Sequence, residues 1–211
     1  MTLSKGQTLA VEGMPVDYAY AVVRGGVKMQ TSLADGRMVI VDFRLPGEFL
    51  ILTEGLSPWT IEAIDESSLC HIRESTLTAV LRDGIPLNAR ASDALTSELR
   101  SASARIARLA LMTPVEKVSS FLLDMRARLA SPDQGRTLDL PMRREEIGQH
   151  LGLTPETVSR MLTRLTGDGT IAIPRPSRIR LLDLARLRCL AEGGSPRRCA
   201  ATRAARGAGA A

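Results

Sequence analysis

The residues best suited to chemistry in this 211-residue chain are three polar side chains in one short segment, Glu156, Ser159 and Arg160. A guanidinium can donate a forked pair of hydrogen bonds to guanine O6 and N7, and a carboxylate can accept one from cytosine N4. At 100° per residue along a helix, the three residues fall within about 100° of one another. The segment therefore predicts a helix whose polar face reads base edges in the major groove of DNA.

The sequence also marks how this helix begins and which side of it is buried. Thr154 can cap the N-terminus, and Pro155 takes the first helical position, where a missing N–H costs nothing. The opposite side is apolar and predicts a core contact through Val158, Met161, Leu162 and Leu165.

A second short helix precedes this one. Ile147 and Leu151 form an apolar pair four residues apart, which predicts an inward face. Gly148 allows a close approach between the two helices, and Gly152 permits a left-handed turn between them. This spacing, together with Val158, favours a helix-turn-helix. The alternative is an ordinary helical hairpin with an exposed polar face.

Two short β-prone runs follow, Thr170–Ile173 and Arg178–Leu182, and each comes after a turn signal. They predict a two-stranded wing with Arg180 among its phosphate-binding arginines, and hence a winged helix-turn-helix. The side chains that we expect to contact the DNA backbone are Thr154, Thr157, Thr163, Arg164, Arg175 and Arg178.

The segment RREEIGQHLGLTPETVSRMLTRL, followed by a wing, resembles the CRP/FNR family of bacterial transcription regulators. Its ETVSR portion is similar to the E-T-[IV]-S-R pattern of the FNR and FixK branches. The CRP branch has an arginine and a glycine where this chain has Pro155 and Ser159. The resemblance extends to about Glu192. It implies that Glu156, Ser159 and Arg160 contact bases in a TTGA-type half-site.

The resemblance also implies a mode of action. It implies a homodimer on double-stranded DNA that recruits RNA polymerase, most often as an activator, with targets in low-oxygen respiration or nitrogen metabolism. A ligand- or gas-sensing regulator, with a nucleotide or haem bound in the N-terminal domain, is the alternative. An enzyme is not expected, because no Ser/His/Asp set, P-loop or metal spacing is found, and the only histidines are His71 and His150.

Residues 1–86 read as all-β. Short apolar runs cover Tyr18–Val23, Val27–Gln30, Met38–Leu45, Thr60–Ile64 and Leu69–Ile72, and glycine-containing turn signals separate several of them. Such a series predicts a small barrel or β-roll. It resembles the cyclic-nucleotide-binding β-roll of the CRP/FNR family, whose P-G-[DE]-x turn is matched by PGEF at residues 46–49.

A bound cyclic nucleotide or metal cluster is not expected in this domain. A buried phosphate needs an arginine, yet none lies between Arg44 and Arg73. Family members with an iron–sulfur cluster need four thiolates, three of them near the N-terminus, and here no cysteine precedes Cys70. The cysteines, which also include Cys189 and Cys199, predict neither a disulfide framework nor a zinc site. We therefore expect no cofactor and no metal.

A long helix is predicted over residues 87–112. Its apolar residues repeat at spacings of 4, 3, 4 and 3, the seam of a two-stranded coiled coil, through Leu95, Leu99, Ala102, Ile106 and Leu109. The alternative is a single helix lying on its own domain. Thr113 and Glu116 form a capping box around Pro114, so a new helix begins there and residues 112–114 form a hinge. The predicted core face of that helix is Val115, Val118, Leu122, Met125 and Leu129.

The sequence thus predicts an α+β protein: a cyclic-nucleotide-binding-type β-roll (1–86), a dimerisation helix (87–112), a winged helix-turn-helix domain (113–192) and a disordered tail (193–211). Net charge is +5, but residues 1–87 carry 7 basic and 11 acidic side chains. This places a polyanionic partner at the C-terminal half. No run of 18 apolar residues and no signal segment is found, so we expect a cytoplasmic protein without a membrane partner.

Overall fold

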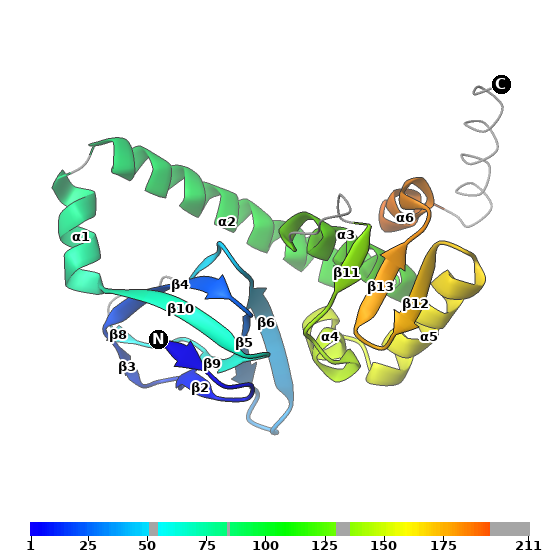
Figure 1. The fold of residues 1–211 in the computed structure, drawn as a ribbon, viewed down its shortest axis with the longest axis horizontal. Coiled ribbons are helices and arrows are strands. Elements are labelled where there is room, and N and C mark those ends of the chain that lie inside the picture. Colours follow the sequence, from blue (N-terminus) through cyan, green and yellow to red (C-terminus); the bar gives the residue numbers. More distant parts are fainter. Residues whose placement is uncertain (51–54, 84, 130–135, 195–211) are drawn as a thin grey trace. The chain divides into compact units, whose positions relative to one another are not determined.

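The computed structural model describes residues 1–50, 55–83, 85–129 and 136–194. It has an α+β fold, as the sequence predicts, and divides into two compact units, Met1–Ile106 and Ala107–Ala211 (Figure 1). Each unit is described by itself below. No helix among the described residues is long and apolar enough to cross a membrane.

The first unit is a β-roll of antiparallel strands. One four-stranded sheet has the order β1-β10-β4-β7, a second has the order β2-β9-β5-β6, and β3 pairs with β8. The strands are β1 (Thr2–Leu3), β2 (Thr8–Ala10), β3 (Pro15–Val16), β4 (Tyr18–Arg24), β5 (Val27–Ser32), β6 (Met38–Arg44), β7 (Phe49–Leu50), β8 (Gly55–Leu56), β9 (Thr60–Ala63) and β10 (Ser67–Arg73).

The core of the roll is filled by alternating strand residues. In β9, for example, Ile61 and Ala63 are buried while Thr60 and Glu62 are only partly so. The five runs expected from the sequence correspond to β4, β5, β6, β9 and β10, so these predictions are confirmed. The strands that the sequence did not predict are two or three residues long, too short for an alternating pattern to be recognised.

Residues 1–86 are not all-β, however. Helix α1 (Glu74–Asp83) follows β10 directly, and its first N–H, from Glu74, bonds to the carbonyl of Asp17 at 3.0 Å. The apolar residues Leu77, Val80 and Leu81 are spaced three and four apart, which is a helical period. The all-β prediction is therefore wrong for residues 74–83, where the apolar residues follow the helical period instead.

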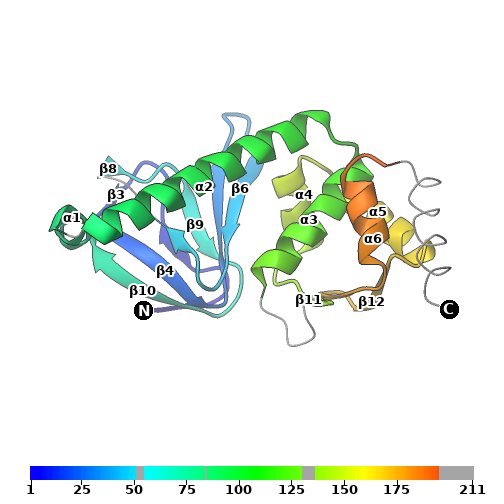
Figure 2. The ribbon, with the colours of Figure 1, turned by 90° about the horizontal axis from the view of Figure 1, so that it is seen from above.

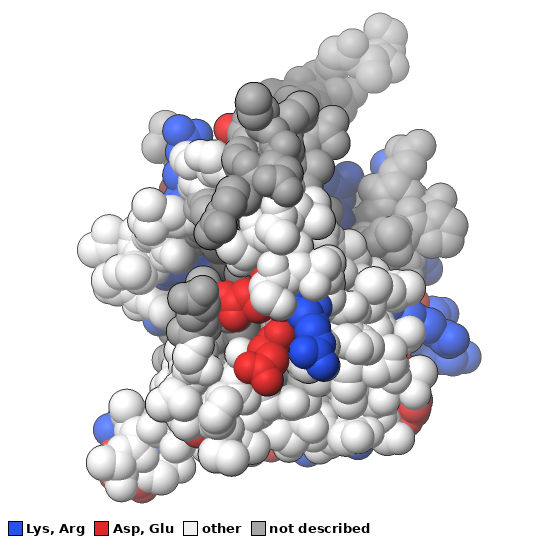
Figure 3. Space-filling model, turned by 90° about the vertical axis from the view of Figure 1, so that its left-hand side faces the viewer, with Lys and Arg blue, Asp and Glu red and all other residues white. Residues whose placement is uncertain are grey.

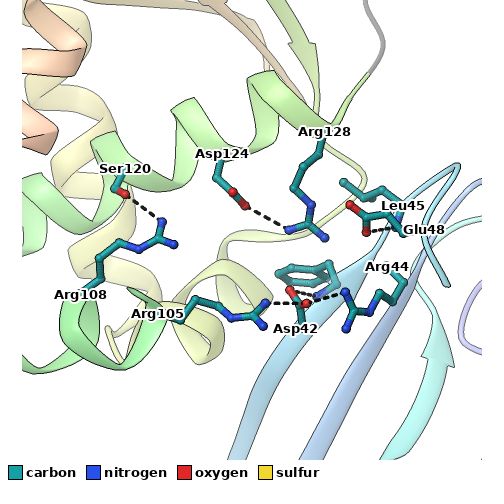
Figure 4. Close-up of polar contacts among 10 residues, drawn as sticks. Asp42, Arg44, Leu45, Glu48, Arg105, Arg108, Ser120, Asp124 and Arg128 are labelled. Carbon is teal, nitrogen blue, oxygen red and sulfur yellow. Dashed lines mark hydrogen bonds and ion pairs between the residues drawn. The ribbon is translucent and has the colours of Figure 1, made fainter. Parts of the chain in front are cut away.

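Helix α2 (Ile85–Leu111) matches the predicted long helix and is fastened to the roll by a buried carboxylate. Asp42 of β6 is 2% exposed. One of its oxygens contacts Nη1 of Arg44 at 3.2 Å and also Nη1 of Arg105 from α2 (Figure 4). Arg105 of α2 therefore contacts the roll of its own chain.

The second unit combines helices with a small sheet. Its elements are α3 (Pro114–Arg128), β11 (Thr137–Asp139), α4 (Arg144–Leu151), α5 (Pro155–Gly167), β12 (Ile171–Arg175), β13 (Arg178–Leu181) and α6 (Leu184–Ala191). The sheet has the order β11-β13-β12, so the wing has a third strand that the sequence did not predict. Helix α6, which packs beside α3 (Figure 2), was also not predicted.

Helix α3 begins where the capping box placed it. The N–H of Thr113 donates to Oε2 of Glu116 at 2.9 Å. Val118, Leu122 and Met125 are buried as predicted, whereas the remaining two residues of the predicted core face, Val115 and Leu129, are half-buried.

Of the cysteines, Cys70 is a free and exposed thiol. Cys199 and nearly all of the predicted tail, residues 195–211, lie outside the described residues.

Candidate DNA-binding site

The predicted recognition helix is α5, and its N-terminus is capped as expected. The hydroxyl of Thr154 accepts a hydrogen bond from the N–H of Thr157 at 3.2 Å, and Pro155 is the first helical residue. This cap satisfies one of the N–H groups that a helix start leaves without a partner. The helix is thereby fixed at its first turn, next to Glu156.

The two sides of α5 differ as the sequence predicts. Val158, Leu162 and Leu165 are buried, and Met161 is half-buried. The opposite side is exposed and polar, with Glu156, Ser159, Arg160 and Thr163. The structure therefore brings together the three side chains predicted to contact bases.

The turn between α4 and α5 depends on two glycines. Gly152 caps α4 in the left-handed conformation, with a φ of +62°. At Gly148, a Cβ atom would lie 2.6 Å from the carbonyl oxygen of Leu153. The left-handed turn predicted at Gly152 is confirmed, whereas Gly148, predicted to allow a close approach of the two helices, makes room for Leu153 of the turn.

Two threonine hydroxyls lie beside Arg160. The Nη2 of Arg160 donates to Oγ1 of Thr157 at 3.4 Å, and that oxygen lies 3.1 Å from Oγ1 of Thr154. Thr157, which we expected to contact a phosphate, is half-buried and already engaged by these two neighbours. Its position suits it to orient the guanidinium of Arg160. The other expected backbone contacts on α5, Thr163 and Arg164, are exposed.

The start of α4 contains two residues, not predicted from the sequence, whose hydrogen bonds support the motif. Glu146 is 5% exposed and accepts a hydrogen bond from the N–H of Arg143 at 2.8 Å, which caps the helix. The Nη2 of Arg144 donates to the carbonyl of Pro176 at 3.1 Å, and burial lowers the pKa of this half-buried arginine. Arg144 thus joins α4 to the tip of the wing. The position of Arg144 in the first turn of α4 was the sequence feature that could have identified it.

The arginines of the wing are not equivalent. Arg175 and Arg180 are exposed. Arg178 instead pairs with Asp139 of β11, with Nε 2.6 Å from Oδ1 and Nη2 2.9 Å from Oδ2. These hydrogen bonds hold the pKa of Asp139 below its usual value and raise that of Arg178. The charge of Arg178, expected to contact phosphate, is therefore largely neutralised by a residue that sequence reasoning missed.

The roll offers a different kind of surface. Figure 3 shows the side of the molecule on which Figure 1 labels α1, β3 and β8, and Lys, Arg, Asp and Glu are sparse on that face. Inside the roll, the buried Lys28 pairs with Glu62 at 2.9 Å. The exposed arginines of α5 and the wing lie in the second unit.

A capped helix with an exposed Glu/Ser/Arg face, a tight glycine turn and an arginine-bearing wing define a winged helix-turn-helix DNA-binding protein. The second unit matches the Crp-like helix-turn-helix domain over residues 116–190, and the first matches the cyclic nucleotide-binding domain over residues 1–83.

Known proteins agree with this class. The nitrogen fixation regulation protein FixK of Bradyrhizobium diazoefficiens is 36% identical over 190 residues, covering 89% of this chain and 80% of the relative. The transcriptional activator protein FnrL of Cereibacter sphaeroides is 30% identical, covering 86% and 76%. The structure of FixK2 from Bradyrhizobium japonicum superposes with a TM-score of 0.84 at 34% identity, covering 90% and 95%. The chain belongs to the CRP/FNR family of DNA-binding transcription regulators, which are not enzymes.

Proposed function

We propose that this protein is a homodimeric transcription activator that binds TTGA-type palindromic DNA and recruits RNA polymerase. The observation that carries the proposal is the exposed face of α5, where Glu156, Ser159 and Arg160 stand together on a capped helix. The names of the relatives add that FixK regulates nitrogen fixation and that FnrL is a transcriptional activator. Because the partner is genomic DNA, we place the working protein in the cytoplasm.

The homodimer is supported by the uncovered side of α2. Leu99 and Ile106 are each 69% exposed, Leu109 is 44% exposed and Ala102 is half-buried. These residues share one side of the helix at coiled-coil spacing. Leu95 belongs to the same predicted seam, but its side chain lies outside what the structure describes. Pairing two copies along this seam would supply two recognition helices for two half-sites.

Base reading by Arg160 is tested with duplexes that carry or lack the palindrome. The half-site centres should lie roughly 10–10.5 base pairs apart. We expect Arg160→Ala to cost about 1–3 kcal/mol of binding free energy on the palindrome and to relax the preference at one G·C pair, because a forked hydrogen-bond donor is lost. Titration of labelled palindromic and random duplexes measures both effects.

Arg164→Ala is the matched control on the same helix. An arginine that contacts only phosphate should weaken binding to palindromic and random duplexes by the same factor. If Arg160→Ala behaves in that uniform way, the base-reading face has been assigned to the wrong residues.

A ligand-sensing regulator is the second candidate, and the match of residues 1–83 to the cyclic nucleotide-binding domain favours it. Against it, the described segment from Gly55 to Ile72 contains no arginine to hold a phosphate. There, the hydroxyl of Ser57 is buried against its own chain and donates to the carbonyl of Trp59 at 2.6 Å. We therefore propose a roll that supports the dimer without needing a nucleotide.

A further inference from the structure

The wing holds an ion pair whose position is unusual for a surface that faces DNA. Asp139 and Arg178 lie opposite each other in the β11–β13 ladder. The carboxylate engages Nε and Nη2 of the guanidinium side-on, at 2.6 and 2.9 Å. Both side chains remain well exposed, at 61% and 43%. An acidic group thus occupies the side of Arg178 that a phosphate would otherwise contact.

Stability does not explain this pair well. Exposed ion pairs contribute about 0–1 kcal/mol to folding. The two strands are joined without it, since they form a backbone ladder and bury Leu138 and Ile179 completely. The effect of Asp139 is therefore expected on the charge of the surface rather than on the fold.

The surrounding charges show what the pair changes. Arg175 is the cross-strand partner of Arg178 in the β12–β13 hairpin, and Arg180 follows on β13. Both are exposed. With Asp139 present, the hairpin offers phosphates the charge of two arginines, and without it the charge of three. Each added phosphate contact strengthens binding to any DNA sequence alike.

We propose that Asp139 determines specificity by withholding Arg178 from the DNA backbone, which lowers sequence-independent binding relative to binding of the operator. This inference rests on the DNA-binding function proposed above. Arg178 is then not one of the phosphate contacts in the wild-type protein, and the wing holds the backbone through Arg175 and Arg180. The hydrogen bond from Arg178 lowers the pKa of Asp139, so the carboxylate is ionised throughout the neutral pH range in which DNA binding is measured.

The test is the salt dependence of binding to a random duplex by the full-length protein. For Asp139→Asn we expect binding that is roughly 5- to 10-fold tighter at 0.1 M salt, with a slope of log K against log salt steeper by about 0.9, the value for one phosphate contact. Arg178→Ala should keep the wild-type slope. The double variant should restore the wild-type affinity and slope, because it leaves the phosphates two arginines and no unpaired carboxylate.

Asp35→Asn provides a control of equal charge change. Asp35 makes a similar exposed ion pair, with Nε of Arg37 at 2.7 Å, but it lies in the roll. Its substitution should leave the slope unchanged. If it steepens the slope as much as Asp139→Asn does, net charge rather than the wing pair is responsible and the proposal is wrong.

Two further results would overturn the proposal. Weaker binding and a shallower slope for Asp139→Asn would mean that the carboxylate presents Arg178 to a phosphate instead of withholding it. Unchanged slopes in all variants would place Arg178 outside the DNA footprint. A wild-type protein with no preference for the palindrome over random DNA would instead refute the proposed function, so the two failures are distinguishable.

Discussion

Helices α2 and α5 each leave one side uncovered, but the two uncovered sides are chemically opposite. On α5 the exposed residues are Glu156, Ser159 and Arg160, which water solvates well. On α2 they include Leu99 and Ile106, whose exposed apolar surface is unfavourable in water. Exposing the polar side of α5 to water has little free-energy cost, whereas exposing the apolar side of α2 is unfavourable and favours association. The comparison indicates that covering the apolar side of α2 would lower the free energy more than covering the polar side of α5.

The helices also differ in how they are held. Helix α5 buries apolar side chains, and two of them, Val158 and Leu165, have no exposed surface. On α2, in contrast, Arg105 is tied to the roll through the buried Asp42, with Arg44 at the same carboxylate. The ion pair holds Arg105 of α2 beside the roll, while Leu99 and Ile106 of the same helix remain exposed.

The largest effect is expected from Ile106→Lys, which places a charge in the middle of the seam. Burying an unpaired ammonium is strongly unfavourable, so the protein should become monomeric. Palindrome affinity should fall roughly 100-fold, about 2.8 kcal/mol. Sedimentation velocity measures the first effect and duplex titration the second.

Ala104→Lys is the matched control for the seam. Ala104 is exposed and lies about 140–160° around the helix from Leu99 and Ile106, so its substitution should leave the dimer intact. If the Ile106→Lys protein stays a stable dimer, the apolar side of α2 is not the dimer contact and its difference from the polar side of α5 has no bearing on assembly.

A smaller effect is expected from a substitution at Gly148, which packs against the turn that precedes α5. Gly148→Ala puts a Cβ atom 2.6 Å from the carbonyl oxygen of Leu153, and such overpacking costs about 1–3 kcal/mol of unfolding free energy. Denaturant unfolding should show this loss, with a parallel weakening of palindrome binding.

Gly167→Ala controls for the change of residue type. Gly167 lies in the last turn of α5, and a Cβ there would meet no atom within 4 Å other than those of its chain neighbours and its own helix backbone. That variant should be neutral or up to about 1 kcal/mol more stable, because alanine restricts the unfolded chain. Equal losses at both glycines would show that the turn is not closely packed.

The smallest effect is expected from a ligand of the roll. If the seam alone drives pairing, cyclic AMP should change palindrome affinity by less than tenfold, which is about 1.4 kcal/mol of coupling. Titrations with and without the nucleotide, and with non-cyclic AMP as the control, measure this. A larger increase with cyclic AMP alone would mean that a group other than an arginine between Gly55 and Ile72 holds the phosphate.

What could be predicted from the sequence was encoded within a few neighbouring residues. The cap at Thr154, the left-handed Gly152 and the apolar side of α5 depend on contacts one to four residues apart, and such patterns can be read directly from a sequence. The same holds for the seam of α2 and for the start of α3 at Thr113. These local signals were sufficient to place the candidate DNA-reading face.

Contacts between residues far apart in the sequence were decided only by the tertiary structure. Strand β11 is three residues long and carries no pattern of its own, yet it brings Asp139 onto Arg178. Asp42 and Arg105 meet because β6 and α2 pack together, and nothing near either residue indicates the other. Such long-range ion pairs depend on how whole elements pack, because the packing, and not the neighbouring residues in the chain, determines which side chains meet.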